Sequence, residues 1–139
     1  MTSHKILIIE DNLLNLELAT DLLEANGFVV HSAQTAEEGL RLAHELLPDL
    51  VLMDFSLPGM DGLSATKNLK QNPATRQLIV AGLTANAMKG DEELALAAGC
   101  DAYLTKPIDT RTFVDTVRKL IATANFPTVK KSTPDDYAN

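Results

Sequence analysis

Three features are scarce in this chain of 139 residues, and each scarcity excludes a class of protein. Its single cysteine, Cys100, cannot form an internal disulfide, so we expect a small buried thiol in a cytoplasmic protein. No apolar run reaches the roughly 18–20 residues of a membrane helix. We expect no cleavable signal, because residues 1–5 lead directly into the first predicted strand. Basic residues are few, 12 against 19 acidic ones, and the net charge of -7 argues against a nucleic-acid partner.

The chain instead alternates strand-length apolar runs with longer segments of helical period. This alternation occurs five times and predicts an α/β fold, a doubly wound parallel sheet of five strands with helices on both faces. The predicted strands span residues 5–9, 28–32, 50–53, 78–83 and 102–104, and the predicted helices span 13–25, 35–47, about 63–71, 87–98 and 109–124.

Local signals mark several helix ends. Gly27 is suited to a left-handed C-terminal cap, and Thr35 with Glu38 forms a capping-box pattern. Asp109 is a suitable N-cap for the last helix, and Gly90 weakens the fourth. The apolar rows are Leu14, Leu18 and Leu22 beside Leu16, Ala19 and Leu23 in the first helix, an inward stripe of Ala36, Leu40, Ala43 and Leu47 in the second, and buried Phe113, Val117, Leu120 and Ala124 in the fifth.

The domain organisation is simple. We expect residues 1–124 to form one domain with a single core, since this length is sufficient for one. Beyond Asn125 the chain turns polar and contains Pro127 and Pro134, so residues 125–139 are predicted to form a mobile tail.

Polar residues follow the ends of four predicted strands. Parallel strands bring their carboxyl ends to one edge of the sheet, where open α/β sheets bind ligands, so we expect these side chains to converge. Any one of them alone is commonly a solvated edge group, but their agreement over four strands favours a functional site. The residues are Glu10 and Asp11 after the first strand, Asp54 at the end of the third, Thr84 at the end of the fourth and Lys106 after the fifth.

The first pair of acids has a second interpretation. Glu10 and Asp11 precede the first helix directly, where either carboxylate could serve as its N-cap, although Asn12 competes for that role.

The predicted cluster is suited to phosphoryl transfer onto Asp54. A carboxylate is a weak nucleophile that repels a phosphoryl group, so transfer requires a cation and positioned hydrogen-bond donors. The three acids offer only oxygen ligands, which suits Mg²⁺. We expect Lys106 to pair with Asp54 and later with a phosphoryl oxygen, and the Thr84 hydroxyl and the backbone N–H of Ala85 to donate to the same group.

Four segments resemble the signature blocks of the bacterial response-regulator receiver domain: Ile8–Asn12, Leu52–Gly62, Leu83–Ala85 and Tyr103–Pro107. The resemblance covers about residues 4–124 and is greatest to stand-alone receivers, including the cell-division regulator type. It implies a flavodoxin-like strand order, 2-1-3-4-5. It also implies a signalling phosphoacceptor rather than an enzyme, with self-catalysed phosphoryl transfer and autodephosphorylation.

The resemblance implies roles for the matched acids. Asp54 matches the phosphoacceptor, Asp11 the direct Mg²⁺ ligand and Glu10 the acid that reaches the metal through water. Ser56 matches the position whose backbone carbonyl completes the metal site.

It also implies roles in a switch. Thr84 and Lys106 match the phosphoryl-binding hydroxyl and amine, and Tyr103 matches the aromatic that changes rotamer when Thr84 moves. We expect phosphorylation to alter the face made by the fourth helix, fifth strand and fifth helix, where a downstream effector protein binds.

The phosphoryl group is expected to come from another protein. The histidines, His4, His31 and His44, are all predicted to lie on the surface. The resemblance implies a sensor histidine kinase or a histidine phosphotransfer protein as donor, docking near the first helix, and a monomer or weak dimer. The effector and the pathway are not predicted.

Three alternatives share parts of this pattern. A phosphatase with an aspartyl nucleophile needs a second acid two residues after the first, where this chain has Ser56. A flavodoxin-like electron carrier needs a phosphate-binding first loop, which Glu10 and Asp11 oppose. An interaction module that is never phosphorylated needs no complete set of site residues.

Overall fold

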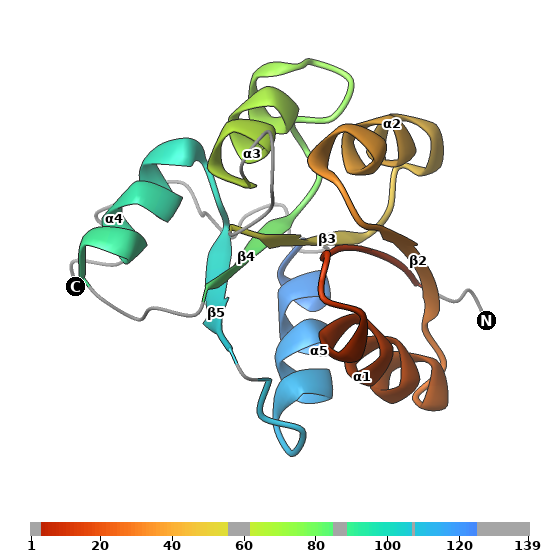
Figure 1. The fold of residues 1–139 in the computed structure, drawn as a ribbon. Helices are drawn as coiled ribbons and strands as arrows, with labels where there is room; N and C mark the ends of the chain where they lie inside the picture. The colour runs from red at the N-terminus through yellow and green to blue at the C-terminus, as the bar shows by residue number, and fades with distance from the viewer. Residues whose placement is uncertain (1–3, 56–61, 85–88, 107, 125–139) are drawn as a thin grey trace.

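The computed structural model describes residues 4–55, 62–84, 89–106 and 108–124. Within them, all strands are parallel and form one sheet in the order β2-β1-β3-β4-β5 (Figure 1). The strands are β1 (Lys5–Ile9), β2 (Val29–Ala33), β3 (Leu50–Asp54), β4 (Val80–Thr84) and β5 (Ala102–Thr105). The helices are α1 (Leu13–Ala25), α2 (Ala36–Leu46), α3 (Gly62–Gln71), α4 (Lys89–Ala98) and α5 (Phe113–Ala124). The predicted fold class and strand order are confirmed.

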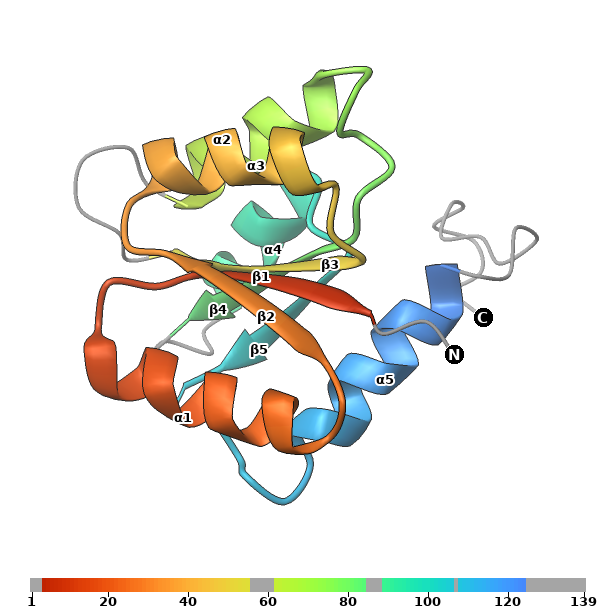
Figure 2. The same cartoon turned by 90° about the vertical axis from the view of Figure 1, so that its right-hand side faces the viewer.

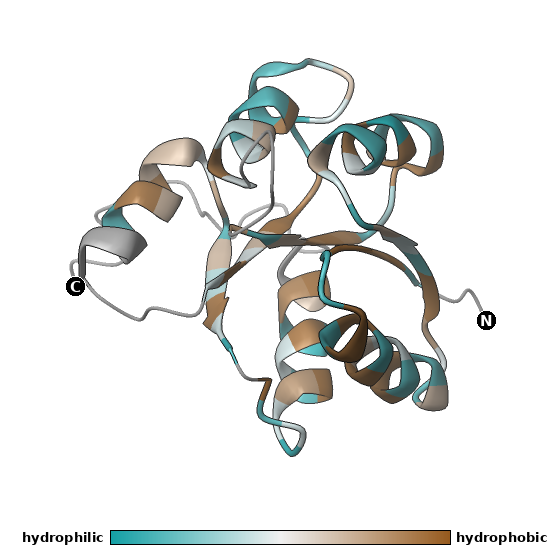
Figure 3. Cartoon of the chain, viewed as in Figure 1, coloured by the Kyte–Doolittle hydropathy of each residue, from teal (hydrophilic) through white to brown (hydrophobic). Residues whose placement is uncertain are grey.

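Helices cover both faces of the sheet, as Figures 1 and 2 show. α1 and α5 pack on one face, and α2, α3 and α4 pack on the other. β1, β3 and β4 are buried along nearly their whole length because helices exclude water from both sides, which explains their continuous apolar sequences. Apolar residues accordingly line the strands in Figure 3, while the outer sides of α2 and α3 are polar.

Two apolar clusters, one on each face, hold the layers together. Alternate strand residues enter opposite clusters because successive side chains of a strand point to opposite faces. The α2–α3–α4 cluster includes Leu7, Ile9, Val51, Met53, Val80, Ala95 and Cys100, and the α1–α5 cluster includes Ile6, Ile8, Leu52, Leu83, Leu23, Phe113 and Val117.

The predicted ends of the first two helices are confirmed in their main features. Asn12 is the N-cap of α1, and its Oδ1 accepts a hydrogen bond from Asn15 N at 3.0 Å. Gly27, just beyond this helix, has φ of +91°. Thr35 Oγ1 accepts from Glu38 N at 3.2 Å, which is the hydroxyl half of the capping box.

The last helix begins later than predicted. Asp109 Oδ1 accepts from Arg111 N at 3.0 Å, and Asp109 O accepts from Phe113 N at 2.9 Å. The side chain therefore caps a turn over residues 110–112, and α5 itself starts at Phe113. Strand bounds also shift, since β2 starts and ends one residue later and β4 starts two residues later than predicted.

Two predicted apolar rows are only partly inward. Leu14 is 77% exposed and Leu18 is 39% exposed, while Ala19 and Leu23 carry the packing of α1. In the second helix the expected stripe ends early, because Leu47 is the left-handed C-cap of α2 and is half exposed. In α5, Ile121 is buried in addition to the predicted Phe113 and Val117, while Leu120 is only partly buried and the Ala124 side chain lies outside the described residues.

An ion pair between Lys70 and Asp101 joins the amino ends of β4 and β5. Lys70 Nζ on α3 donates to Leu78 O at 2.6 Å and to Asp101 Oδ2 at 2.8 Å. The same carboxylate oxygen accepts from Val80 N at 2.9 Å. One ion pair thus joins the connections that enter β4 and β5.

Some expectations lie outside the described residues, namely those for Ser56, Ala85 and the tail at 125–139. None of the helices within the described part of the chain is both long and apolar enough to cross a membrane.

Cys100 is predicted to be unreactive in the folded protein. Its thiol is buried beside Thr66, and this burial raises its pKa to about 11. An aromatic disulfide reagent at pH 8 should therefore label the native protein at least about 100-fold more slowly than the urea-unfolded protein, measured by absorbance. Equal rates would contradict the buried placement.

Candidate functional site

The predicted site residues converge because of the register of the sheet. Ile9 of β1 lies opposite Met53 of β3, so Glu10 follows β1 at the level where Asp54 ends β3. Asp54 in turn lies opposite Leu83, the residue before Thr84. All of these positions lie at the carboxyl edge, as predicted.

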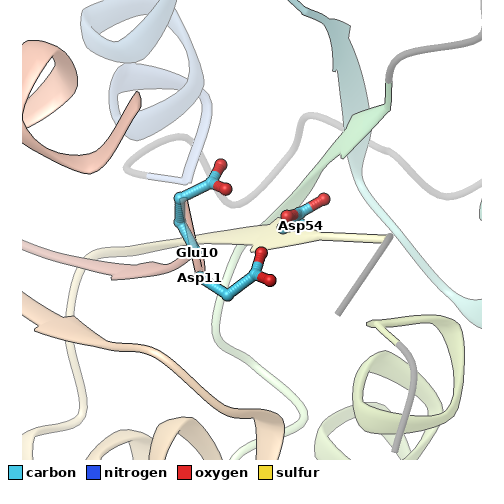
Figure 4. A group of neighbouring side chains, drawn as sticks. All are labelled: Glu10, Asp11 and Asp54. Atoms are coloured by element: carbon cyan, nitrogen blue, oxygen red, sulfur yellow. The ribbon is translucent and has the colours of Figure 1, made fainter. Parts of the chain in front are cut away.

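Three carboxylates gather at this edge, and we call Glu10, Asp11 and Asp54 the acidic cluster. Each offers one oxygen, and these atoms lie within 4.8 Å of one another. Figure 4 shows the three side chains around the end of β3. Asp54 is 0% and Glu10 1% exposed, whereas Asp11 faces solvent. The cluster is thus buried on one side and open on the other.

Lys106 supplies the cation at this cluster. Its Nζ lies 3.1 Å from Asp54 Oδ2 and 3.2 Å from Glu10 Oε1. Its backbone N donates to Thr84 O at 2.7 Å, which fixes the residue beside the end of β4. The predicted pairing of Lys106 with Asp54 is therefore present, and Glu10 is an additional partner.

Backbone contacts hold Glu10 in place. Its N–H donates to Ala33 O at 3.0 Å, and its Oε2 accepts from Asn12 N at 3.0 Å. Asn12 is the N-cap of α1, so the alternative in which Glu10 or Asp11 caps this helix is wrong. Glu10 and Asp11 are instead members of the acidic cluster.

The cluster perturbs the protonation of its own members. Burial raises the pKa of Glu10, the negative charge of Asp54 raises it further, and the hydrogen bond from Asn12 and the charge of Lys106 oppose this rise. Burial acts to lower the pKa of Lys106, but the hydrogen bond and charge of Asp54 together with the charge of Glu10 outweigh it, so the pKa is raised. Lys106 is consequently a cation at neutral pH.

The chemistry of the cluster fits a divalent cation. Three carboxylates face one ammonium, so the site is negative when all are ionised. The donors are oxygens only, the type that Mg²⁺ prefers, and the solvent-facing side leaves room for the waters that this ion retains. The same negative charge disfavours a flavin phosphate after β1.

The predicted switch residues flank the cluster. Thr84 is buried at the end of β4, and Tyr103 on β5 is partly buried against the α2–α3–α4 cluster. That Phe55 lies beside the site was not predicted from the sequence. Phe55 directly follows Asp54, and its ring lies over Gly82 of the next strand. An aromatic residue after the acid and a glycine within an apolar strand were visible in the sequence, but only the fold brings them together.

Comparison with known proteins agrees with this geometry. The family model of the response regulator receiver domain matches residues 6–118. The polar-differentiation response regulator DivK of Brucella ovis is 44% identical over 119 residues, which are 86% of this chain and 97% of that protein.

Solved structures show the same fold. The receiver domain of a sensor histidine kinase from Pseudomonas aeruginosa, which has a magnesium ion coordinated in its active-site cleft, is 32% identical with a TM-score of 0.80 and matches 87% of this chain and 99% of its own. A CheY-like receiver domain protein from Methanospirillum hungatei is 27% identical with a TM-score of 0.82, over 89% of this chain and 98% of its own. From its fold, its acidic cluster and these relatives, we conclude that the chain belongs to the response regulator receiver domain family.

Proposed function

We propose that Asp54 accepts a phosphoryl group from a histidine of a sensor kinase or phosphotransfer protein, and that the modified domain signals by binding another protein or by passing the group on. The observation that carries this proposal is the buried Asp54 carboxylate, held 3.1 Å from an ammonium inside a cluster of three acids. Such a group has a cation in place for the charge of an incoming phosphoryl group.

Glu10, Asp11 and Asp54 are the residues that would hold Mg²⁺. Ser56 would add its backbone carbonyl by resemblance to the family, and it lies outside the described residues. The bound ion supplies positive charge that offsets the repulsion between carboxylate and phosphoryl oxygens. The magnesium ion in the Pseudomonas receiver supports this assignment.

The transfer itself exchanges one bond for another. An Asp54 carboxylate oxygen forms a bond to phosphorus while the bond from phosphorus to the donor imidazole nitrogen breaks, and the imidazole retains that electron pair. Lys106 Nζ then pairs with a phosphoryl oxygen and the Thr84 hydroxyl donates to another. Ala85, which would add its backbone N–H, lies outside the described residues.

The added charge would be converted into a surface change through the same residues. Phosphorylation adds about one negative charge and three acceptor oxygens. Thr84 moves towards them, Tyr103 turns inward, and the face of α4, β5 and α5 changes for an effector protein. Lys106 N and Thr84 O already join the ends of β4 and β5, which supports this route.

We place the phosphodonor against α1. This helix begins two residues after Asp11 and exposes three leucines, Leu13 at 59%, Leu14 at 77% and Leu18 at 39%. An apolar row this exposed, at the edge of the site, is suited to contact with a partner helix.

The central prediction concerns Asp54. Wild-type protein with acetyl phosphate and Mg²⁺ should gain one phosphoryl group that hydroxylamine removes, and Asp54→Asn should gain none, because it lacks the nucleophile. Intact-mass spectrometry measures both. Asp115→Asn, at an exposed acid on α5, is the matched control and should react as wild type. Equal labelling of Asp54→Asn would refute the proposal.

Metal binding is predicted to depend on Asp11. Asp11→Asn should weaken Mg²⁺ binding by at least about ten-fold, since even a residue that only supports a metal ligand changes affinity by 10–100-fold. Isothermal titration calorimetry measures this, with Asp21→Asn on the exposed side of α1 as control. Unchanged affinity in Asp11→Asn would remove this residue from the site.

Lys106 is predicted to oppose the metal while assisting the phosphoryl group. Lys106→Met removes a positive charge next to Asp54 and Glu10, so Mg²⁺ should bind at least about five-fold more tightly, a change on the order of 1 kcal/mol. The same variant should lose the chemical-shift changes of β5 on phosphorylation. Weaker Mg²⁺ binding would contradict the sign of this interaction.

A further inference from the structure

Phe55 is enclosed by two glycines. An ideal Cβ at Gly82 would overlap its ring, with Cε1 and Cε2 both at 2.6 Å. An ideal Cβ at Gly62, where α3 starts, would overlap the backbone, with Phe55 Cα at 2.8 Å and Asp54 C at 2.9 Å. The ring therefore occupies the place of a side chain at Gly82, and the backbone next to Asp54 is held beneath α3.

The register places this ring next to the switch. Gly82 on β4 lies opposite Tyr103 on β5, and neighbouring strands are about 4.8 Å apart. Phe55 and Tyr103 both pack against the α2–α3–α4 cluster, so their side chains are on the same face of the sheet. Thr84, two residues after Gly82, also belongs to this face.

We propose that Phe55 is a positioning residue that connects Asp54 to Tyr103: its ring, seated over Gly82, forms the wall against which Tyr103 packs when it turns inward. This inference rests on the proposed function, because it concerns how the modified Asp54 is read. It adds a packing contact to the route through Thr84.

The physical basis is close packing. A glycine opposite Tyr103 would leave a gap on the sheet, and a gap lacks the contacts that stabilise an inward aromatic side chain. The Phe55 ring fills that gap and offers an aromatic partner. Its position is coupled to Asp54 because the two residues are adjacent and Phe55 N donates to Leu83 O at 3.0 Å.

The test uses beryllofluoride with Mg²⁺ as a phosphoryl mimic on the full chain. The sequence has two tyrosines, Tyr103 and Tyr137, so a Tyr137→Phe background leaves one labelled tyrosine to follow by NMR. Phe55→Leu should bind the mimic, because Phe55 is not a ligand, but its Tyr103 shift change should fall by about two-fold or more, as expected for coupled neighbours.

Two further variants separate positioning from general packing. Phe55→Tyr keeps a ring over Gly82 and should restore the wild-type response of Tyr103. Leu40→Ala removes a partly buried side chain from the same cluster, on α2, and should leave that response unchanged. If circular dichroism shows that Phe55→Leu does not fold, Phe55→Met takes its place.

The outcomes are distinguishable. If all variants bind the mimic and Tyr103 responds equally in Phe55→Leu and wild type, or is equally impaired in Leu40→Ala, the inference is overturned while the proposed function stands. If wild-type protein does not bind the mimic, the proposed function fails and this inference fails with it.

Discussion

The structure of this site depends on one ammonium group between two buried carboxylates. Asp54 and Glu10 are almost inaccessible to solvent, and Lys106 Nζ lies 3.1 Å and 3.2 Å from their oxygens. Burying like charges side by side is costly unless a cation and hydrogen bonds compensate for lost hydration. The partial compensation is visible in the raised pKa of Glu10, which burial and Asp54 cause despite Lys106. The three carboxylates outnumber the one ammonium, so the site favours the binding of a further cation.

Lys106 links the carboxyl ends of four strands. Lys106 follows β5, its carboxylate partners follow β1 and end β3, and its backbone bonds to Thr84 at the end of β4. These contacts are the ones that the proposed phosphorylation of Asp54 would alter. No long pathway is needed, because the sheet register brings these residues together.

The strands and the site residues at their ends could be predicted from the sequence, because each is marked by a local pattern of residues. The central strands are continuous apolar runs, and each places a polar residue at its end, so the positions of Glu10, Asp54 and Thr84 followed directly. Helix faces were harder. Nearly every side of α1 carries leucine, so periodicity could not decide whether Leu14 or Leu23 faces the core. Non-local packing, such as that of Phe55 on Gly82, leaves no periodic signal at all.

The ion pair between Lys70 and Asp101 makes the two ends of β4 and β5 different. It joins the amino ends of β4 and β5, while Asp54 and Lys106 lie at the opposite edge of the sheet. The two ends of these strands therefore differ: side-chain contacts tie the amino ends together, whereas the carboxyl ends carry the charged groups of the acidic cluster and Lys106. Under the proposed function, we therefore expect rearrangement after phosphorylation to be largest at the carboxyl ends of β4 and β5.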